Sequence, residues 1–222
     1  MKQIFICGDS TAASYDPEKT LMVGWGQLLS GYLPGVSVVN LAMAGRSTKT
    51  FLEEGRLDPL AASARPGDLA LVQFAHNDEN EKKPERYVSV PVFRENLAYF
   101  ARFARERETL PVFLTPVCMR IWQDGALRPT HGDYPAAMVA EAGALSVPLI
   151  DLYAESFRIV SALGEEGSKA LFMHFPPGTD PRYPEGQEDN AHTRFAGADR
   201  FAAFAAAELK RLGLVPAWPL PL

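Results

Sequence analysis

Cysteine is scarce in this sequence, with Cys7 and Cys118 the only two in 222 residues. Cys7 lies in an apolar run of strand length and Cys118 follows another, so we expect buried free thiols and no disulfide scaffold. Long apolar stretches are also missing, because none approaches the roughly 20 residues that a helix needs to span a bilayer. The chain enters strand-like sequence at its third residue without a signal-peptide pattern, and we therefore expect a cytoplasmic protein.

Long basic runs are absent as well. The formal net charge is -5, which makes nucleic acid and membrane surfaces poor partner candidates. The densest charged segment, residues 79–86, mixes both signs and is interpreted as a solvated loop. With 47% hydrophobic and 22% charged residues, the chain can bury one large core. We expect a single domain, residues 1–222, that forms a monomer or a small homo-oligomer.

Apolar runs of strand length alternate along the chain with segments of helical spacing. The runs do not alternate polar and apolar residues, which is typical of strands buried on both faces. This order predicts an α/β fold in which helices cover both faces of a parallel sheet. The expected strands are residues 3–7, 36–41, 68–74, 111–116 and 147–152, and the expected helices are residues 26–33, 52–64, 91–107, 134–144 and 196–211.

Two long segments, residues 119–133 and 172–190, break this alternation and contain many turn residues. Structureless stretches of this length are usually functional loops. In such a sheet, ligands bind outside the carboxyl ends of the strands, where these loops lie. Ser10, Gly45 and Asn77 each follow the end of an expected strand as well. We therefore expect these distant parts of the chain to converge at one edge of the sheet.

Ser10 lies in the sequence Gly-Asp-Ser-Thr directly after the first expected strand. A serine hydroxyl is a weak nucleophile unless a base removes its proton, and His192 is the natural base. Asp189, three positions earlier, would share one face of a helical turn with His192 and orient its imidazole. These residues form the predicted catalytic triad of a serine hydrolase. Each segment alone also fits a structural role, a strand-to-helix turn at Ser10 or a helix cap at Asp189.

Acyl transfer also needs hydrogen-bond donors for the oxyanion. Gly45 has no Cβ, so its backbone N–H can approach a ligand closely. The side-chain amide of Asn77 and the backbone N–H of Ser10 complete a predicted oxyanion hole. Taken singly, Gly45 is a turn glycine and Asn77 a loop asparagine. Their matched positions at strand ends carry the argument.

Ser10, Gly45, Asn77 and His192 match in order the four blocks of the SGNH, or GDSL-type, hydrolases, and the sequence resembles that family over nearly its whole length. Finer strings resemble the rhamnogalacturonan acetylesterase branch. They are Gly-Asp-Ser-Thr-Ala-Ala at 8–13, Gly-Trp-Gly-Gln at 24–27, Ala-Gly-Arg-Ser-Thr-Lys-Thr-Phe at 44–51, His-Asn-Asp at 76–78, Tyr-Pro-Glu-Gly at 183–186 and Asp-Asn-Ala-His-Thr at 189–193. The sequence departs from that branch at Ala75, where glycine is more common, and at Ala191, where threonine is usual. Neither departure removes a catalytic group.

The resemblance implies a three-layer α/β/α, flavodoxin-like fold with a five-stranded parallel sheet. It also implies a serine esterase that removes acetyl groups from pectin-derived, rhamnogalacturonan-type or related plant oligosaccharides, with no metal or organic cofactor. Two other functions stay open. One is a lipase- or thioesterase-like acyl hydrolase with the same triad, which would need an apolar acyl pocket. The other is a saccharide-binding module that has lost catalysis.

Three further side chains are candidates for substrate binding. Trp25 and Trp122 offer aromatic faces that can stack on sugar rings. For Trp25 a role in supporting the catalytic loop is favoured over substrate contact, whereas Trp122 lies in a long loop at the reactive edge. His76 adjoins Asn77, where it would shape the site or form a structural hydrogen bond.

The remaining candidates have weaker signals. His131 and His174 show no spacing of a known zinc or calcium site, so no metal site is predicted. The apolar, proline-rich segment 215–222 is expected to pack across its own domain or to join a subunit contact. Candidates for binding a uronate carboxylate are Arg46, Arg120 and Arg128.

Overall fold

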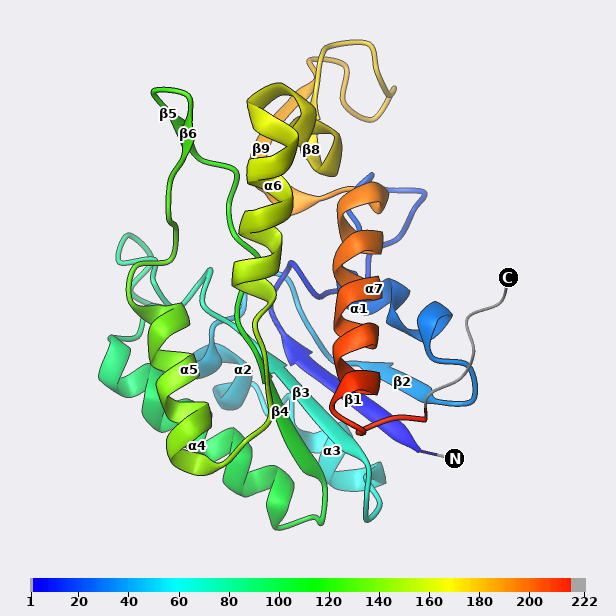
Figure 1. Ribbon diagram of the computed structural model, residues 1–222, viewed down its shortest axis with the longest axis vertical. Coiled ribbons are helices and arrows are strands. Elements are labelled where there is room, and N and C mark those ends of the chain that lie inside the picture. Colours follow the sequence, from blue (N-terminus) through cyan, green and yellow to red (C-terminus); the bar gives the residue numbers. More distant parts are fainter. Residues whose placement is uncertain (1, 217–222) are drawn as a thin grey trace.

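The computed structural model describes residues 2–216, and a five-stranded parallel sheet stands at its centre (Figure 1). The strand order is β2-β1-β3-β4-β7, and all four neighbouring pairs are parallel. The predicted α/β fold with a five-stranded parallel sheet is therefore confirmed. The strands are β1 (Gln3–Gly8), β2 (Ser37–Asn40), β3 (Leu69–Gln73), β4 (Leu110–Leu114) and β7 (Leu149–Ile150).

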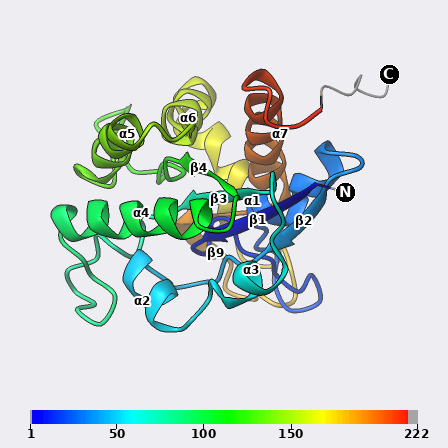
Figure 2. The ribbon, with the colours of Figure 1, turned by 90° about the horizontal axis from the view of Figure 1, so that it is seen from below.

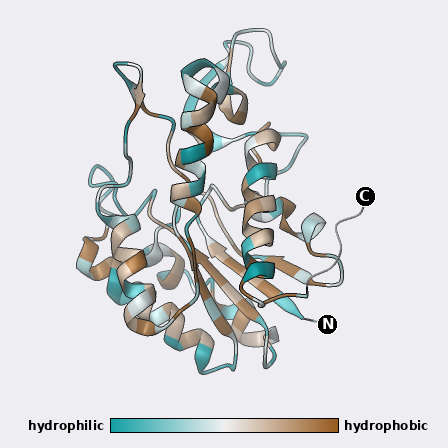
Figure 3. Ribbon diagram, in the orientation of Figure 1, coloured by the Kyte–Doolittle hydropathy of each residue, from teal (hydrophilic) through white to brown (hydrophobic). Residues whose placement is uncertain are grey.

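Helices cover both faces of the sheet, and Figure 2 shows the resulting layers from below. Ile4 and Ile6 of β1 pack with the helices of one face, whereas Phe5 and Cys7 pack with those of the other. Figure 3 shows hydrophobic, brown strands between these helices. The first face carries α1 (Trp25–Leu28), α6 (Leu152–Ser168) and α7 (Phe195–Arg211), and the second carries α2 (Thr48–Glu53), α3 (Asp58–Ser63), α4 (Val90–Arg105) and α5 (Tyr134–Leu145).

Some helices differ from the sequence prediction. The expected helix 52–64 is interrupted between α2 and α3, where Gly55 adopts a φ of +66° that a helix does not allow. The expected helix 26–33 consists of α1 and a 3-10 turn, η1 (Leu29–Tyr32). Helix α6 was not predicted. It begins directly after β7 because the Asp151 side chain accepts a hydrogen bond from the N–H of Ala154 and caps it.

Both segments that were expected to be loops contain an antiparallel hairpin. Residues 119–133 form β5 (Trp122–Gln123) and β6 (Ala126–Leu127). A 3-10 turn, η2 (Lys169–Leu171), leads into β8 (Phe172–Phe175), which pairs with β9 (Gln187–Thr193). Both hairpins lie above the carboxyl ends of the sheet strands, at the top of Figure 1. The expected position of these segments is correct, but their expected lack of strands is wrong.

The two cysteines are buried free thiols, as predicted. Within residues 2–216, no helix is long and apolar enough to cross a lipid bilayer. In the proline-rich segment 215–222, Val215 is buried, while residues 217–222 lie outside the described residues. The packing expected for that segment stays a prediction.

Candidate active site

Ser10 lies two residues after β1, in a turn that buried polar side chains hold in place. Asp9 is fully buried, and its Oδ1 accepts hydrogen bonds from the backbone N–H and the hydroxyl of Thr11, at 2.9 and 2.8 Å. Gln73, at the end of the neighbouring strand β3, donates to Asp9 Oδ2 and accepts from Trp25 Nε1 at 3.0 Å. The turn that presents Ser10 is thus built on the core of the sheet.

His192 and Asp189 reach Ser10 from β9. The distance from His192 Nε2 to Ser10 Oγ is 2.9 Å, and the distance from His192 Nδ1 to Asp189 Oδ2 is 2.7 Å. Two hydrogen bonds tie this end of β9 to the segment after β1: Val23 N–H donates to Thr193 O at 3.0 Å, and the Thr193 hydroxyl donates to Val23 O at 2.7 Å. The fold therefore brings the three residues of the predicted triad together.

The local structure around Asp189 is not the predicted helical turn. Asp189 and His192 belong to a strand, where side chains three positions apart normally face opposite sides. The register between β8 and β9 is irregular here, because β9 carries extra residues between its two ends. Asp189 Oδ1 accepts the backbone N–H groups of Ala191 and His192 at 2.8 and 3.0 Å. This turn leaves Oδ2 directed at the imidazole.

These hydrogen bonds set the charges of the pair. The bond to Asp189 raises the pKa of His192 above its usual value, although burial acts in the opposite direction. Burial works to raise the pKa of Asp189, but the hydrogen bonds that it accepts from His192 and from backbone N–H groups lower the pKa overall. An ionised Asp189 holds the Nδ1–H tautomer of His192, so that Nε2 faces Ser10 as an acceptor.

Neighbouring strand ends bring the predicted oxyanion donors to Ser10. Strand β1 lies between β2 and β3, so the segments that carry Gly45 and Asn77 flank the serine. The backbone N–H groups of Ser10 and Gly45 donate to no acceptor among residues 2–216. Asn77 Nδ2 donates one hydrogen to the Arg46 carbonyl at 2.9 Å, which leaves its second N–H for a ligand.

The two tryptophans lie in different environments. Trp25 is fully buried and donates its Nε1–H to Gln73, so it supports the catalytic turn and offers no face to a sugar. Its proposed substrate contact is therefore wrong for this conformation. Trp122 lies on β5 and packs, partly buried, against the core. Substrate contact by Trp122 stays a prediction.

His76 lies beside Asn77, at the carboxyl end of the sheet. Its ring is 4.2 Å from the ring of His131, centroid to centroid, in a T-shaped arrangement. Burial, followed by the charges of His131 and His192, lowers its pKa well below the usual value, so His76 is neutral. It also lines a hollow of about 530 Å³ with Glu79 and Met119. A neutral imidazole at this place is compatible with both roles considered for His76, shaping the site and forming a structural hydrogen bond.

The arginines considered for a uronate carboxylate are engaged elsewhere. Arg46 Nε lies 3.0 Å from a carboxylate oxygen of Glu54, and Arg128 forms an ion pair within the β5–β6 hairpin. Arg120 is only 4% exposed. Its Nη1 donates to Asn190 Oδ1 at 2.9 Å, and its backbone N–H donates to Asn190 O at 2.7 Å. Arg120 therefore anchors the strand that carries His192, a role that no local sequence signal indicates.

Sequence reasoning also missed Tyr15 and Arg86. The Tyr15 hydroxyl donates to the Ser10 carbonyl at 2.8 Å. Arg86 closes the charged segment 79–86, which was interpreted as a solvated loop, yet its side chain is only 24% exposed. Its Nη1 donates to Asn77 Oδ1 at 2.9 Å. Both residues touch the catalytic machinery from segments without a recognisable motif.

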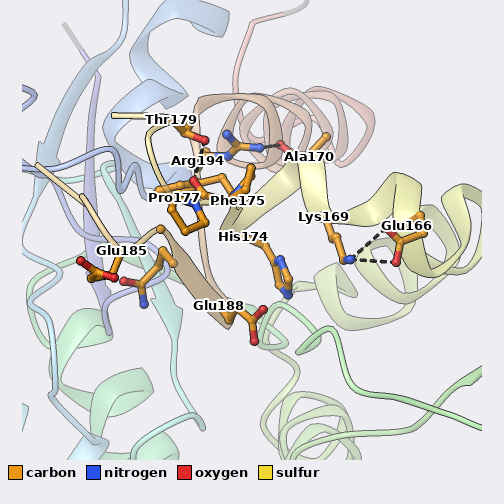
Figure 4. Close-up of a pocket in the computed structure, with 13 residues that line it drawn as sticks. Glu166, Lys169, Ala170, His174, Phe175, Pro177, Thr179, Glu185, Glu188 and Arg194 are labelled. Atoms are coloured by element: carbon orange, nitrogen blue, oxygen red, sulfur yellow. Dashed lines mark hydrogen bonds and ion pairs between the residues drawn. The ribbon is translucent and has the colours of Figure 1, made fainter. Parts of the chain in front are cut away.

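A hollow of about 890 Å³ lies beside the β8–β9 hairpin (Figure 4). His174 and Glu188, which face each other in the hairpin register, both line it, whereas the next residue, Asp189, points to His192. Lys169 at its rim pairs with Glu166 at 2.7 Å. None of the triad residues lines this hollow, so it is separate from the catalytic contacts.

Two curated proteins of Bacillus subtilis (strain 168) are similar over nearly the whole chain. Rhamnogalacturonan acetylesterase RhgT is 42% identical over 214 residues, which are 96% of this chain and 91% of that protein. Probable rhamnogalacturonan acetylesterase YesY is 36% identical over 213 residues, which are 95% of this chain and 94% of that protein.

Two solved structures are similar to this chain in fold, and a family model matches most of its sequence. Protein YxiM from Bacillus subtilis superposes with a TM-score of 0.81 at 28% identity, covering 96% of this chain and 57% of that chain. Axe2, an acetylxylan esterase from Geobacillus stearothermophilus, shares the fold with a TM-score of 0.67 at 16% identity, covering 98% and 97% of the two chains. The sequence model of the GDSL-like lipase/acylhydrolase family matches residues 6–200. The chain therefore belongs to the GDSL-like lipase/acylhydrolase family, as its resemblance implied, and it is an esterase.

Proposed function

We propose that this esterase removes O-acetyl groups from pectin-derived, rhamnogalacturonan-type or related plant oligosaccharides. The observation that carries the proposal is the line of contacts from Asp189 through His192 to Ser10, at 2.7 and 2.9 Å. The two Bacillus subtilis relatives, whose names specify rhamnogalacturonan acetylesterases, support the choice of substrate. The cytoplasmic location stays a prediction. A cytoplasmic enzyme would meet imported acetylated oligosaccharides and not intact pectin, so we propose oligosaccharides as the substrates.

In the proposed mechanism, Ser10 Oγ attacks the acetyl carbonyl while His192 Nε2 takes its proton. Asp189 stabilises the imidazolium that forms. The tetrahedral oxyanion accepts hydrogen bonds from the N–H groups of Ser10 and Gly45 and from Asn77 Nδ2. His192 then gives its proton to the departing sugar oxygen, leaving an acetyl group on Ser10.

Water completes the reaction by the reverse proton path. His192 Nε2 removes a proton from the water as its oxygen attacks the acetyl carbonyl. When the second tetrahedral intermediate collapses, the proton returns to Ser10 Oγ and acetic acid leaves. Each proton transfer in this scheme passes through His192 Nε2.

A second candidate function is a lipase- or thioesterase-like acyl hydrolase with the same triad. A hollow of about 580 Å³, whose lining includes Leu21, Met22, Val23 and Phe195, favours it, because a longer acyl chain needs apolar surface. None of the triad residues lines this hollow, but Tyr15 does, and its hydroxyl donates to the Ser10 carbonyl at 2.8 Å, which connects the hollow to the catalytic turn.

Ester cleavage by wild type and two serine variants tests these functions. The substrates are acetylated rhamnogalacturonan oligosaccharides, acetylated xylo-oligosaccharides and p-nitrophenyl esters of increasing acyl length. We expect acetate release from a saccharide that falls about 10⁴-fold or more in Ser10→Ala. Ser30→Ala, which removes an exposed hydroxyl on η1, is the matched control and should keep wild-type activity.

The outcomes separate the candidates. Cleavage of longer esters without saccharide turnover would replace the acetylesterase proposal with the acyl-hydrolase function. Tight saccharide binding without any turnover would indicate a binding module instead. Saccharide turnover that survives in Ser10→Ala would remove Ser10 from the mechanism.

A further inference from the structure

Arg86 connects the two chain segments that carry Gly45 and Asn77, two residues of the predicted oxyanion hole. Its Nη1 donates to Asn77 Oδ1 at 2.9 Å and to the Gly45 carbonyl at 3.2 Å. Gly45 and Asn77 belong to segments that follow different strands, β2 and β3. One guanidinium nitrogen therefore fixes the position of one donor-bearing segment relative to the other.

The contact also fixes the orientation of the Asn77 amide. A guanidinium can only donate and a carbonyl oxygen can only accept. Asn77 Oδ1 faces Arg86, while Nδ2 faces the Arg46 carbonyl at 2.9 Å. A flipped amide would set donor against donor and acceptor against acceptor. Arg86 thus keeps Nδ2, the hydrogen-bond donor, directed at the Arg46 carbonyl, with its second N–H left for a ligand.

The charge of Arg86 is less compensated than that of its neighbour Arg46. Arg46 Nε donates to both carboxylate oxygens of Glu54, at 3.1 and 3.0 Å. Arg86 Nε makes no hydrogen bond within the described part of the chain, and Glu85 Oε1 lies 4.0 Å away. A cation bound to the oxygen of an amide polarises it and strengthens its N–H as a donor. Asn77 is the amide that receives this effect.

The backbone around Arg86 is anchored by hydrogen bonds, and Gly45 leaves space for the guanidinium. Val88 N–H donates to Asp78 O at 3.0 Å, and the Tyr134 hydroxyl donates to Val88 O, so the turn before Arg86 and the chain after it are anchored on α5. Gly45 has a φ of +79°, and a Cβ there would lie 3.2 Å from Arg86 Nη1. Glycine at this position therefore leaves room for the guanidinium as well as for the backbone conformation.

We propose that Arg86 is a positioning residue of the oxyanion hole. It acts on the acyl oxygen through the amide of Asn77 and does not itself touch the substrate. The inference rests on the proposed acyl-transfer role of Ser10 and His192, but it is independent of which sugar carries the acetyl group.

Steady-state kinetics with p-nitrophenyl acetate test the inference in a double-variant cycle. Arg86→Gln is expected to lower kcat about 10- to 10²-fold with less than about a twofold change in KM, because the lost effect belongs to the transition state. Asn77→Ala is expected to lower kcat about 10²- to 10³-fold. In the Asn77→Ala background, Arg86→Gln should lower kcat less than about threefold, because the route through the Asn77 amide is gone and only the longer bond to the Gly45 carbonyl remains.

The control is Arg102→Gln, which makes the same charge change on a side chain of α4 that is 64% exposed. It should leave kcat unchanged. Equal effects of Arg86→Gln with and without Asn77 would overturn the inference. A rise in KM without a fall in kcat would also overturn it and make Arg86 a substrate-binding residue.

A second variant at Arg86 and a comparison of two substrates cover the cases in which Arg86→Gln fails to fold or the proposed function fails. If Arg86→Gln fails to fold, Arg86→Lys enters the same cycle with Asn77→Ala, since a lysine keeps the charge but loses the planar guanidinium. The same criteria then apply to its kcat and KM. Failure of the proposed saccharide acetylesterase function can be distinguished from failure of the Arg86 inference. In that case p-nitrophenyl acetate would still be cleaved through Ser10, while acetylated saccharides would not.

Discussion

The nucleophile and the base of this esterase are held by different kinds of structure. Ser10 follows β1, an interior strand of the main sheet, and rests on a network that includes the fully buried side chains of Asp9 and Gln73. His192 and Asp189 lie on a hairpin outside the main sheet, and their side chains are 32% and 25% exposed. The core of the fold thus positions the nucleophile, and a peripheral hairpin positions the base and its carboxylate partner. These are called the nucleophile half and the base half of the site.

This difference predicts how stability and activity separate. Buried polar groups that lose their partners destabilise the whole fold, whereas partly exposed contacts on a hairpin contribute little to the free energy of unfolding. Substitutions beneath Ser10 should therefore destabilise the protein. Substitutions around His192 should slow the reaction and leave the stability almost unchanged.

The largest effect is expected from Asp189→Asn. The new Oδ1 can still accept the N–H groups of Ala191 and His192, so the turn is kept. The new Nδ2 presents a donor to His192 Nδ1, which moves the imidazole proton to Nε2 and prevents it from accepting the proton of Ser10. We expect kcat for p-nitrophenyl acetate to fall about 10⁴-fold, with a melting temperature within about 4 °C of wild type.

The matched control is Asp133→Asn, an exposed carboxylate whose side chain caps no helix. It should retain full activity. A fall of less than tenfold in Asp189→Asn would show that Asp189 does not select the tautomer. A large loss of stability would show that the hairpin belongs to the cooperative core, and the division between the two halves would fail.

Gln73→Leu tests the nucleophile half. The substitution removes the acceptor for Trp25 Nε1 and the donor to Asp9 Oδ2, and it leaves both groups buried. Since each such group costs about 1–3 kcal/mol, we expect the free energy of unfolding in urea to fall by about 2–4 kcal/mol. Activity below the melting transition should fall far less than in Asp189→Asn. Gln123→Leu, at an exposed position of β5, is the control, and equal stability of the two variants would contradict the role of the network.

Prediction from the sequence follows the same division. The strands of the central sheet are apolar runs, and Ser10, Gly45 and Asn77 were identified because their places after such runs are encoded locally. The convergence of these residues then follows from parallel pairing of β2, β1 and β3. The core and the residues attached to it were therefore accessible to prediction.

The hairpin side was not accessible in the same way. Residues 187–193 are mostly polar, so they show no apolar pattern that would indicate a strand. The turn that joins Asp189 to His192 depends on a side chain accepting two backbone N–H groups, which no periodicity records. Arg120 acts on this side through its contact with Asn190, and Arg86 acts on the core side through its contact with Asn77. Such pairings become visible only when the chain is folded.

The smallest expected effect is a pH dependence that belongs to the base half. His192 accepts a proton from Ser10 only when it is neutral, and its bond to Asp189 raises its pKa above 6.5. The value of kcat/KM should therefore fall as the pH decreases through a midpoint above 6.5. Stability changes in the opposite direction, because the folded state holds this proton more tightly. That contribution is present below about pH 6.5 and lost as the pH rises through the folded pKa, and for a partly exposed pair it stays under about 1 kcal/mol.

The titration of Asp78 must be distinguished from that of His192, since burial raises the pKa of Asp78 to about 7. Asp78→Asn keeps Oδ1 as the acceptor for the N–H and hydroxyl of Thr48 and removes the second titration. The acid limb of kcat/KM should remain in that variant, because His192 is unchanged. If the limb disappeared, the pH dependence would belong to the buried carboxyl beside Asn77. The buried carboxyl of Asp78, and not the partly exposed imidazole of His192, would then control the pH dependence of the activity.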